Sequence, residues 1–207
     1  MLNKHARAFF SALFTPIAKG LLALGMTPNM VTVIGTVGVC LGALVFYPLG
    51  ELFWGTVFIT LFVFSDLIDG LMARLSGKTS VLGGFLDSCL DRVQDGAVFL
   101  GLLIWFFTGG EHLSLGIAAA VCLLTGNVVS YVRAKAESLG YRADVGIAER
   151  SERMVLTLVF TGFTGLGLHS TVLLIVLTLL AIASIVTIAQ RFRSVIAQAT
   201  TAATGPA

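Results

Sequence analysis

Long apolar stretches, separated by short polar or glycine-containing turns, recur along almost the whole chain. A helix needs about 20 residues to cross a bilayer core of roughly 30 Å. Stretches of this length predict six membrane-spanning helices, near residues 30–48, 52–75, 82–108, 113–138, 152–168 and 170–192. An even number of spans places both ends of the chain on the same side of the membrane.

The segment before the first span has a different pattern. Between residues 4 and 25, apolar side chains recur at helical spacing and basic residues occupy other positions. This arrangement predicts an amphipathic helix that lies in the membrane interface. The apolar positions are Phe9, Phe10, Leu13, Phe14, Ile17, Leu21 and Leu22, and the basic ones are Lys4, Arg7 and Lys19.

The composition supports a membrane protein. Of the 207 residues, 57% are hydrophobic and only 12% are charged, and the mean hydropathy is +0.96, far above that of an ordinary soluble domain. We therefore expect an all-α integral membrane protein, with six transmembrane helices and an N-terminal interfacial amphipathic helix in a single domain over residues 1–197. Residues 198–207 are low in complexity, which predicts a disordered tail or an expression remnant.

Cysteine and histidine usage argues against two classes of site. The three cysteines all lie in apolar stretches and form no C-x-x-C pair, so neither a disulfide framework nor a zinc site is indicated. The three histidines are scattered along the chain, which gives no histidine-based catalytic or metal-binding triad. The start of the chain has no small-residue cleavage site after an apolar core, so we expect no removed signal peptide.

Lysine and arginine concentrate at one end of the predicted bundle. All 13 lie before the first span, beside the turns between spans two and three and between spans four and five, or at the end of span six. The opposite turns, around residues 48–50, 109–111 and 165–167, contain none. Because these residues accumulate in short cytoplasmic loops, the pattern predicts cytoplasmic termini in a multi-pass protein of the cell membrane.

Four aspartates flank the turn between the second and third predicted spans. Asp66 and Asp69 are three residues apart, and Asp87 and Asp91 are four apart, so each pair lies on one face of its helix. The short turn makes the two helices antiparallel neighbours. The two pairs can therefore face each other near the cytoplasmic end of these spans.

Carboxylates near the ends of membrane spans carry a free-energy cost that another group must offset. On insertion scales each costs about 2.5–3.5 kcal/mol at a helix centre and less toward the interface, and four together repel one another. Bound divalent cations remove both penalties, and an all-oxygen ligand set suits Mg²⁺ or Mn²⁺. Two such ions, roughly 3.5–4 Å apart, can bind the attacking and leaving oxygens of an in-line phosphoryl displacement.

Small residues accompany the aspartates. Gly70 and Ala73 lie on the helical face of Asp66, and Gly83 comes one turn before Asp87. Taken singly, each of these small residues is as well explained by close helix packing. Taken together, they leave room for a substrate beside the carboxylates. Arg74 could bind a diphosphate through its planar fork of donors.

The whole segment resembles the signature of a known family. The pattern D-x-x-D-G-x-x-A-R, followed after eight residues by G-x-x-x-D-x-x-x-D, is that of the CDP-alcohol phosphotransferases, and every fixed position is matched between Asp66 and Asp91. The resemblance implies a metal-dependent displacement at the β-phosphorus of CDP-diacylglycerol that releases CMP. It also implies a homodimer.

The resemblance assigns roles to individual residues. Asp66, Asp69, Asp87 and Asp91 would hold two Mg²⁺ or Mn²⁺ ions, and Asp91 would also be the general base. The segment 27–32, T-P-N-M-V-T, resembles the start of the family's first span, although by itself it is only a helix that begins with proline. The residues implied to bind CDP-diacylglycerol are Pro28, Asn29, Thr32, Asp69, Gly70, Ala73, Arg74, Ser80 and Gly83.

A second basic group bears on the acceptor. Lys135, Arg153 and Arg191 are candidates for an acceptor-phosphate pocket, because a bound phosphate would offset their mutual repulsion. The other cations nearby are better explained by the charge bias of the loops or by contact with membrane lipids; these are Arg133, Arg142, Arg150 and Arg193. A phosphorylated alcohol is therefore favoured over free inositol, serine or choline.

The identity of that alcohol depends on a further resemblance. The run A-E-R-S-E-R at 148–153 and the pair Gln190-Arg191 resemble the actinobacterial branch of the family, which uses inositol phosphate and makes phosphatidylinositol phosphate. Glycerol 3-phosphate, the acceptor of phosphatidylglycerophosphate synthesis, stays open as the alternative.

A divalent-cation transporter is a third possibility, since carboxylates within a membrane also mark ion pathways. Against it, spans four to six supply no acidic residue at mid-depth. Asp95, one turn beyond Asp91, is interpreted as a residue that pairs helices.

Overall fold

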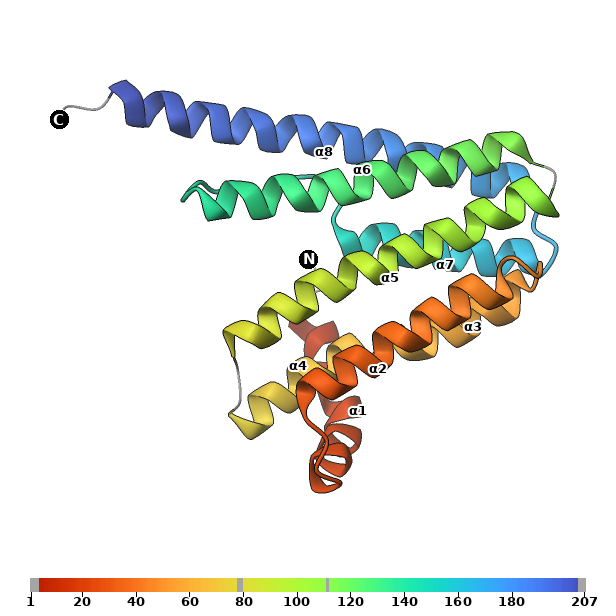
Figure 1. Ribbon diagram of the computed structural model, residues 1–207, viewed down its shortest axis with the longest axis horizontal. Coiled ribbons are helices and arrows are strands. Elements are labelled where there is room, and N and C mark those ends of the chain that lie inside the picture. Colours follow the sequence, from red (N-terminus) through yellow and green to blue (C-terminus); the bar gives the residue numbers. More distant parts are fainter. Residues whose placement is uncertain (1–3, 78–79, 111, 205–207) are drawn as a thin grey trace.

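The computed structural model describes residues 4–77, 80–110 and 112–204. Its regular structure within these ranges is entirely helical (Figure 1), which confirms the predicted all-α class. In chain order the elements are α1 (Lys4–Ala23), α2 (Pro28–Leu41), the π-helical turn η1 (Gly42–Phe46), α3 (Leu52–Val63), α4 (Ser65–Ser76), α5 (Val81–Thr108), α6 (Leu113–Ser138), α7 (Arg150–Gly165) and α8 (Ser170–Thr204).

The protein is integral to the membrane. Four stretches within the described residues are long and apolar enough to cross a bilayer: Pro28–Phe46, Leu52–Ser76, Leu113–Ser138 and Ser170–Thr201. Helix α7 has only 16 residues, fewer than the roughly 20 of a straight span. Helix α5 has 28 residues but carries four charged side chains between Asp87 and Asp95. The count of six spans therefore stays a prediction, although all six predicted stretches are helical.

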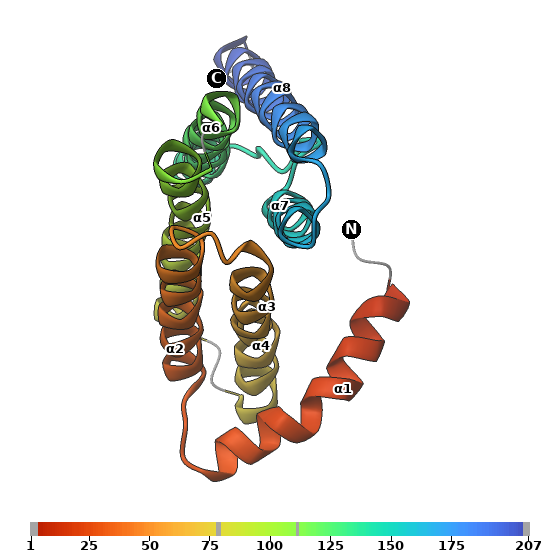
Figure 2. The same ribbon diagram turned by 90° about the vertical axis from the view of Figure 1, so that its right-hand side faces the viewer.

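The spanning helices form a closed ring. Contacts run from α2 to α5, on to α6, α8 and α7, and back through α3 to α2. Figure 2 shows α2, α5 and α6 in one row, with α3, α4 and α7 facing them and α8 beside α6. Helix α1, predicted as an amphipathic helix, crosses the end of this ring and packs against α4. One apolar core takes buried side chains from α2, α3, α5, α6, α7 and α8.

Local signals fix the helix ends that carry the charged residues. Thr27 caps α2 by accepting a hydrogen bond from the Met30 N–H at 3.3 Å, and Pro28 follows at the first helical position, where its missing N–H costs nothing. Ser80 caps α5 in the same way, by accepting from the Gly83 N–H at 3.0 Å. Helix α4 ends at Gly77, whose φ of +66° favours glycine. Gly77 and Ser80 thus bound the short connection between α4 and α5.

The second predicted span is two helices rather than one. Helix α3 ends at Val63 and α4 starts at Ser65, with Phe64 between them at φ −65° and ψ −14°. The break lies directly before Asp66, the first residue of the aspartate motif. Helix α4 can therefore tilt independently of α3, and it packs against both α1 and α2.

Glycine allows a close approach between α5 and the π-helical turn η1. An added Cβ at Gly101 of α5 would collide with the carbonyl oxygen of Ala43 and lie 2.9 Å from its carbonyl carbon. Ala43 belongs to the π-helical turn η1 and is fully buried. Because the colliding atoms are main-chain atoms, no side-chain rotation can relieve the overlap.

We expect Gly101→Ala to destabilise the protein by about 1–3 kcal/mol, the usual cost of overpacking. The change would be measured as a lower midpoint of thermal unfolding in detergent. Gly96→Ala on the same helix is the matched control, since its added Cβ would meet only the Leu123 side chain, at 4.0 Å. Equal midpoints for the two variants would contradict the close contact.

The end of the chain differs from the expectation. Helix α8 continues to Thr204, through most of the segment for which the sequence predicts a disordered tail. Residues 205–207 lie outside the described residues. The helix therefore extends well beyond residue 192, where the sixth span was predicted to end.

Candidate active site

The four aspartates of the motif lie on facing helices. Helix α4 supplies Asp66 and Asp69, and α5 supplies Asp87 and Asp91. Asp66, Asp69 and Asp87 line one cavity, and a single guanidinium nitrogen lies within 3.1 Å of Asp66 and 2.8 Å of Asp91. The two pairs thus converge, as the spacing of the motif led us to expect.

The smaller of two neighbouring cavities has a volume of about 310 Å³ and is bounded by the start of α2, by α4 and by the start of α5. It contains most of the residues predicted to bind CDP-diacylglycerol. Its lining residues are Pro28, Asn29, Thr32, Asp66, Asp69, Gly70, Ala73, Ser80, Gly83, Gly84 and Asp87. Arg74 is exposed and does not line it, although an added Cβ at Gly70 would lie 3.7 Å from Arg74 Nη1. Arg74 therefore lies next to the rim.

Residues at the start of α2 contact both α4 and α5. Thr32 is buried and its hydroxyl donates to Asp69 Oδ2 at 2.5 Å. An added Cβ at Gly83 would lie 3.3 Å from Asn29 Oδ1, so this asparagine reaches across to the start of α5. The T-P-N-M-V-T segment consequently holds one of the aspartates and covers the cavity.

The aspartates fit a divalent cation by their chemistry. Asp69 is only 6% exposed, and among the described residues it takes part in no ion pair. A buried carboxylate without a cationic partner is poorly compensated, and an oxygen-only donor set is the kind that Mg²⁺ and Mn²⁺ prefer. The side chains as they stand do not form a closed ligand set: no group of three or more His, Cys, Asp or Glu residues among those described is gathered tightly enough.

Arg150 occupies part of this space. Its Nη1 contacts Asp91 Oδ1 at 2.8 Å and Asp66 Oδ2 at 3.1 Å, and its Nε contacts Asp95 Oδ1 at 2.9 Å. Its Nη2 donates to Gln94 Oε1 at 3.0 Å. From the sequence alone, Arg150 is explained by the charge bias of the loops or by contact with membrane lipids, and the structure instead places it among the aspartates. No spacing rule connects it to Asp91, which lies on a different helix far away in the sequence.

Gln94 and Asp95 complete the network. The Gln94 side chain is fully buried, and its amide donates to Thr36 Oγ1 at 3.1 Å and to Asp66 Oδ1 at 3.4 Å. Asp95 pairs with arginines of α7, in keeping with its interpretation as a helix-pairing residue. These contacts connect α5 to α2, α4 and α7 at the level of the aspartates.

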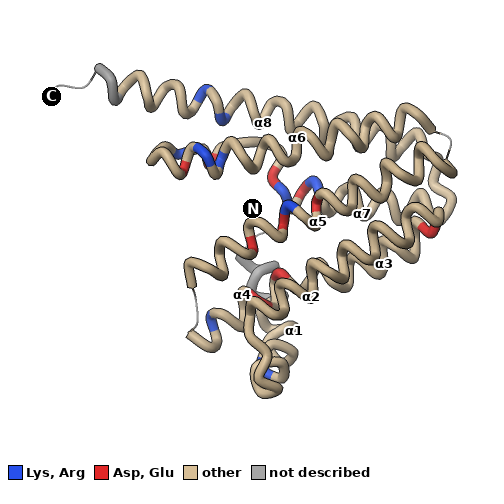
Figure 3. The backbone as a smooth tube through the Cα atoms, viewed as in Figure 1, with Lys and Arg blue, Asp and Glu red and all other residues tan. Residues whose placement is uncertain are grey.

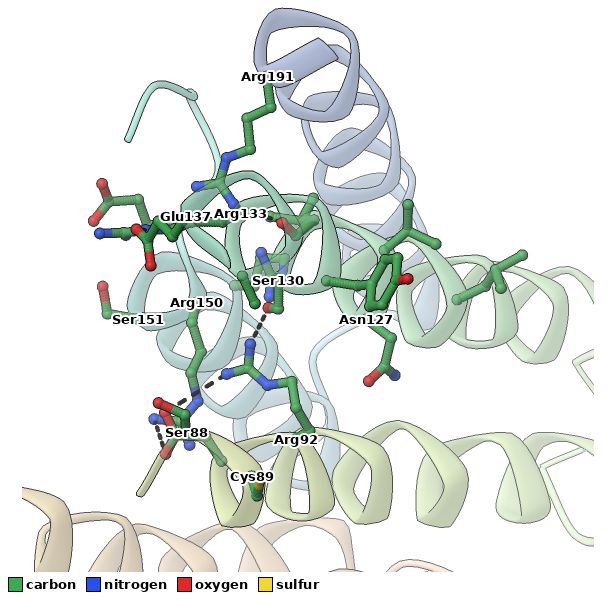
Figure 4. A pocket seen from close by; sticks show the side chains of 18 of the residues that line it. Ser88, Cys89, Arg92, Asn127, Ser130, Arg133, Glu137, Arg150, Ser151 and Arg191 are labelled. Atoms are coloured by element: carbon green, nitrogen blue, oxygen red, sulfur yellow. Dashed lines mark hydrogen bonds and ion pairs between the residues drawn. The ribbon is translucent and has the colours of Figure 1, made fainter. Parts of the chain in front are cut away.

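The second cavity, of about 1010 Å³, lies between α5, α6, α7 and α8. Figure 4 shows Arg133 and Arg191 on one side of it and Arg150 reaching across toward α5. Asp91 also lines it, and it lies one helical turn after Asp87, which lines the smaller cavity. Arg153, a predicted phosphate ligand, is part of the lining together with Arg191. Lys135, the third predicted ligand, is exposed and lies outside the lining.

Arg153 and Arg191 are held mainly by neutral groups. Arg191 is 3% exposed; its Nε donates to the Val145 carbonyl at 2.9 Å and its Nη1 to the Val129 carbonyl at 2.6 Å. Arg153 is 2% exposed and donates to the Ala148 carbonyl at 3.1 Å, with Asp95 3.7 Å away. None of the ion pairs among the described residues involves Arg191. A buried guanidinium without a carboxylate partner favours an anionic ligand.

The connection between α6 and α7 supports the arginines of the larger cavity. Thr187 of α8 accepts hydrogen bonds from the N–H groups of Ile147 and Ala148, both at 3.1 Å. Further along, Ser194 and Gln198 bond to the Arg142 carbonyl. The connection is thus fixed along α8, and it holds the carbonyl groups that orient Arg153 and Arg191.

Charged residues gather toward one end of the ring. In Figure 3 the blue Lys and Arg segments lie toward the end where α4 and α6 terminate. None of the described basic residues lies at the opposite end, where α5 turns into α6 and α7 into α8. Both cavities are at the charged end. The fold and the two cavities define a membrane-integral protein with a carboxylate site between a glycine-lined cavity and an arginine-lined one.

Comparison with known proteins identifies the family. The family described as CDP-alcohol phosphatidyltransferase matches residues 25–189. The chain is 52% identical over 197 residues to the phosphatidylinositol phosphate synthase of Streptomyces avermitilis, covering 92% of this chain and 81% of the relative. It is 42% identical over 191 residues to that of Mycolicibacterium smegmatis, covering 91% and 86%. The chain belongs to the CDP-alcohol phosphatidyltransferase family.

Solved structures of similar proteins agree in fold. The crystal structure of Mycobacterium tuberculosis phosphatidylinositol phosphate synthase with CDP-DAG bound has a TM-score of 0.85 and 41% identity, covering 89% of this chain and 94% of that one. The same protein in complex with manganese and citrate has a TM-score of 0.84 and 42% identity, covering 88% of each. That relative therefore takes up both a divalent metal and CDP-DAG.

Proposed function

We propose that the protein transfers the phosphatidyl group of CDP-diacylglycerol to inositol phosphate, forming phosphatidylinositol phosphate and releasing CMP. The observation that carries the proposal is that aspartates of one motif line two different cavities. One is lined by the motif of the CDP-alcohol phosphatidyltransferase family, and the other by buried arginines. The names of the similar proteins, and the CDP-DAG bound by one of them, support the same activity.

In the proposed reaction the smaller cavity holds the cytidine diphosphate. Gly70, Ala73 and Gly83 leave room for it, and Arg74 at the rim supplies a cation. The lipid tails would leave the cavity toward the bilayer. Divalent cations held by Asp66, Asp69, Asp87 and Asp91 would neutralise charge on the diphosphate and make the acceptor hydroxyl more acidic.

Asp91 is the proposed general base, because it lines the acceptor cavity and faces the nucleotide site. It takes the proton of the acceptor hydroxyl while the alcohol oxygen forms a bond to the β-phosphorus. The bond from that phosphorus to the bridging oxygen breaks, and the bridging oxygen leaves as part of CMP. Asp66 and Asp69 would hold the divalent cations against the diphosphate, and in this way they would keep the β-phosphorus in line with the attacking oxygen.

The larger cavity accounts for the choice of a phosphorylated acceptor. Arg153 and Arg191 are both buried and are held mainly by main-chain carbonyls. A phosphate group would accept charge-assisted hydrogen bonds from them. A free alcohol would leave Arg191 without an anionic partner and Arg153 with only the 3.7 Å contact to Asp95. Lys135, also proposed as a phosphate ligand, would reach the site from its exposed position at the end of α6.

Thr32 offers a test of the nucleotide side. We expect Thr32→Val to lower kcat/KM for CDP-diacylglycerol by about 10- to 100-fold, because a hydrogen bond to a charged group contributes roughly 1.5–3 kcal/mol. Steady-state CMP release at saturating acceptor would measure this. Thr32→Ser keeps the hydroxyl and is the matched control. Equal loss in both variants would mean that the threonine acts through packing alone.

Membership of the family does not establish the number of metal ions, the oligomeric state or the orientation in the membrane. We propose two ions per site, Mg²⁺ or else Mn²⁺, a homodimer, and an active site and termini on the cytoplasmic side of the cell membrane. The single domain would cover residues 1–197. The gathering of basic residues at one end supports this orientation. Cysteine labelling from each side of vesicles, and mass measurement in detergent, would test orientation and dimerisation.

The deciding experiment is CMP release by the purified protein supplied with CDP-diacylglycerol and Mg²⁺. Inositol phosphate, free inositol and glycerol 3-phosphate would be compared as acceptors. We expect turnover with inositol phosphate only. Turnover with glycerol 3-phosphate only would keep the mechanism and change the product to phosphatidylglycerophosphate. Absence of CMP release, together with uptake of Mn²⁺ into vesicles, would favour the transporter interpretation.

A further inference from the structure

Arg150 has a position that the proposed reaction does not explain. Its Nη1 contacts both Asp66 and Asp91, at 3.1 and 2.8 Å. These are two of the four carboxylates to which the divalent cations are assigned. Figure 4 shows the side chain extending from α7 across the cavity toward α5. The guanidinium therefore uses oxygen atoms that a divalent cation would need.

The same side chain also belongs to the acceptor cavity. Arg150 lines it together with Arg153 and Arg191. It is the first residue of α7, and the helix start is fixed by a capping box in which the Glu149 N–H donates to Glu152 Oε2 at 3.0 Å. The main chain at Arg150 is thus held in place, while the long side chain above it can turn. Both subsites lie within reach of one guanidinium.

We propose that Arg150 couples the two subsites. It neutralises Asp66 and Asp91 until a divalent cation binds to them, and its guanidinium then turns to the phosphate of the acceptor. The proposal deepens the proposed function and rests on it. A cation and a guanidinium cannot share the same two oxygens without strong repulsion, whereas a phosphate offers the guanidinium a fork of acceptors that matches its donors.

Asp95 gives the movement a fixed point. It is not one of the four motif aspartates, and it contacts Nε of Arg150 at 2.9 Å, so this contact can persist while Nη1 leaves Asp91. The buried Gln94 accepts from Nη2 and also donates to Asp66. After the guanidinium turns, Gln94 still supports Asp66.

The coupling has a thermodynamic consequence. If metal binding releases Arg150 to the acceptor site, the acceptor must tighten metal binding by the same factor as metal tightens acceptor binding. Removing the guanidinium should make metal binding tighter, because its competitor is gone. Removing the guanidinium should also reduce the factor by which the acceptor tightens metal binding.

The test is a titration of the purified full-length protein with Mn²⁺ alone, with and without inositol phosphate, following the electron paramagnetic resonance signal of free Mn²⁺. In the wild type we expect inositol phosphate to tighten Mn²⁺ binding by about fivefold or more, the lower end of usual coupling factors. In Arg150→Gln we expect Mn²⁺ alone to bind at least about fivefold more tightly than in the wild type, and inositol phosphate to change that by less than about twofold.

Unchanged Mn²⁺ affinity and unchanged coupling in Arg150→Gln would overturn the role of Arg150 and leave the proposed function standing. Failure of the wild type to bind Mn²⁺ would overturn both. Arg142→Gln, an exposed arginine of the same connection, is the control and should match the wild type. If Arg150→Gln does not fold, Arg150→Lys decides the question: one ammonium cannot bridge Asp66, Asp91 and Asp95, so Mn²⁺ should still bind more tightly than in the wild type.

Discussion

Replacing Asp91 with asparagine should lower CMP release at least about 1,000-fold, since a general base alone contributes 10²–10⁴-fold and the change also weakens a metal ligand. Asp91 is the aspartate that lines the acceptor cavity while facing the motif aspartates across the helix pair. Asparagine has nearly the same shape and can still accept a hydrogen bond from Arg150. The loss would therefore report on the carboxylate charge and its basicity rather than on packing.

The measurement is single-turnover CMP release with saturating CDP-diacylglycerol and inositol phosphate. Asp144→Asn, an exposed aspartate in the connection before α7, is the matched control and should keep wild-type activity. Size-exclusion profiles in detergent would establish that both variants are folded. Loss of a general base costs at least about 10²-fold in rate. If Asp91→Asn retained more than about a tenth of the wild-type activity, Asp91 could not be the general base.

Replacing Arg191 with glutamine should raise KM for inositol phosphate by about 10- to 150-fold, the equivalent of 1.5–3 kcal/mol for a charge-assisted hydrogen bond. KM for CDP-diacylglycerol should change little, because Arg191 lies away from the smaller cavity. Glutamine can still donate to the Val129 or Val145 carbonyl, which limits the structural damage. Steady-state CMP release with each substrate varied in turn would separate the two constants.

Arg193→Gln is the control for this prediction. Arg193 lies two residues further along α8, is exposed and is attributed to the charge bias of the loops. Its removal should leave both constants within about twofold of the wild type, as is usual for exposed charges. If Arg191→Gln and Arg193→Gln behaved alike, the acceptor phosphate would have to bind elsewhere.

The aspartate site could be predicted because its information is local. Asp66, Asp69, Asp87 and Asp91 lie on two helices joined by a short turn, so helical periodicity alone brings their faces together. The helices themselves could be predicted from apolar length. The break at Phe64 could not, because the apolar pattern runs through it without proline or glycine.

The acceptor side was harder to predict because it depends on contacts between distant helices. Arg150 and Arg153 are separated by less than one helical turn, and both were visible as basic residues beside a span. Only the packing of α7 against the rest of the ring turns Arg150 toward the aspartates. Arg133 lines the larger cavity, whereas Lys135 is exposed and lies outside its lining. Two residues of helical rotation produce this difference, and a count of charges along the sequence does not reveal it.

The length of α8 has a consequence for the supply of acceptor. At 1.5 Å per residue its 35 residues extend about 52 Å, whereas the hydrocarbon layer is only about 30 Å thick. The final turns must therefore stand in water, and they are the turns to which the connection before α7 is tied through Ser194 and Gln198. A hydrophilic cyclitol phosphate such as inositol phosphate could diffuse to these projecting turns without crossing the hydrocarbon layer, while the lipid donor enters laterally from the leaflet.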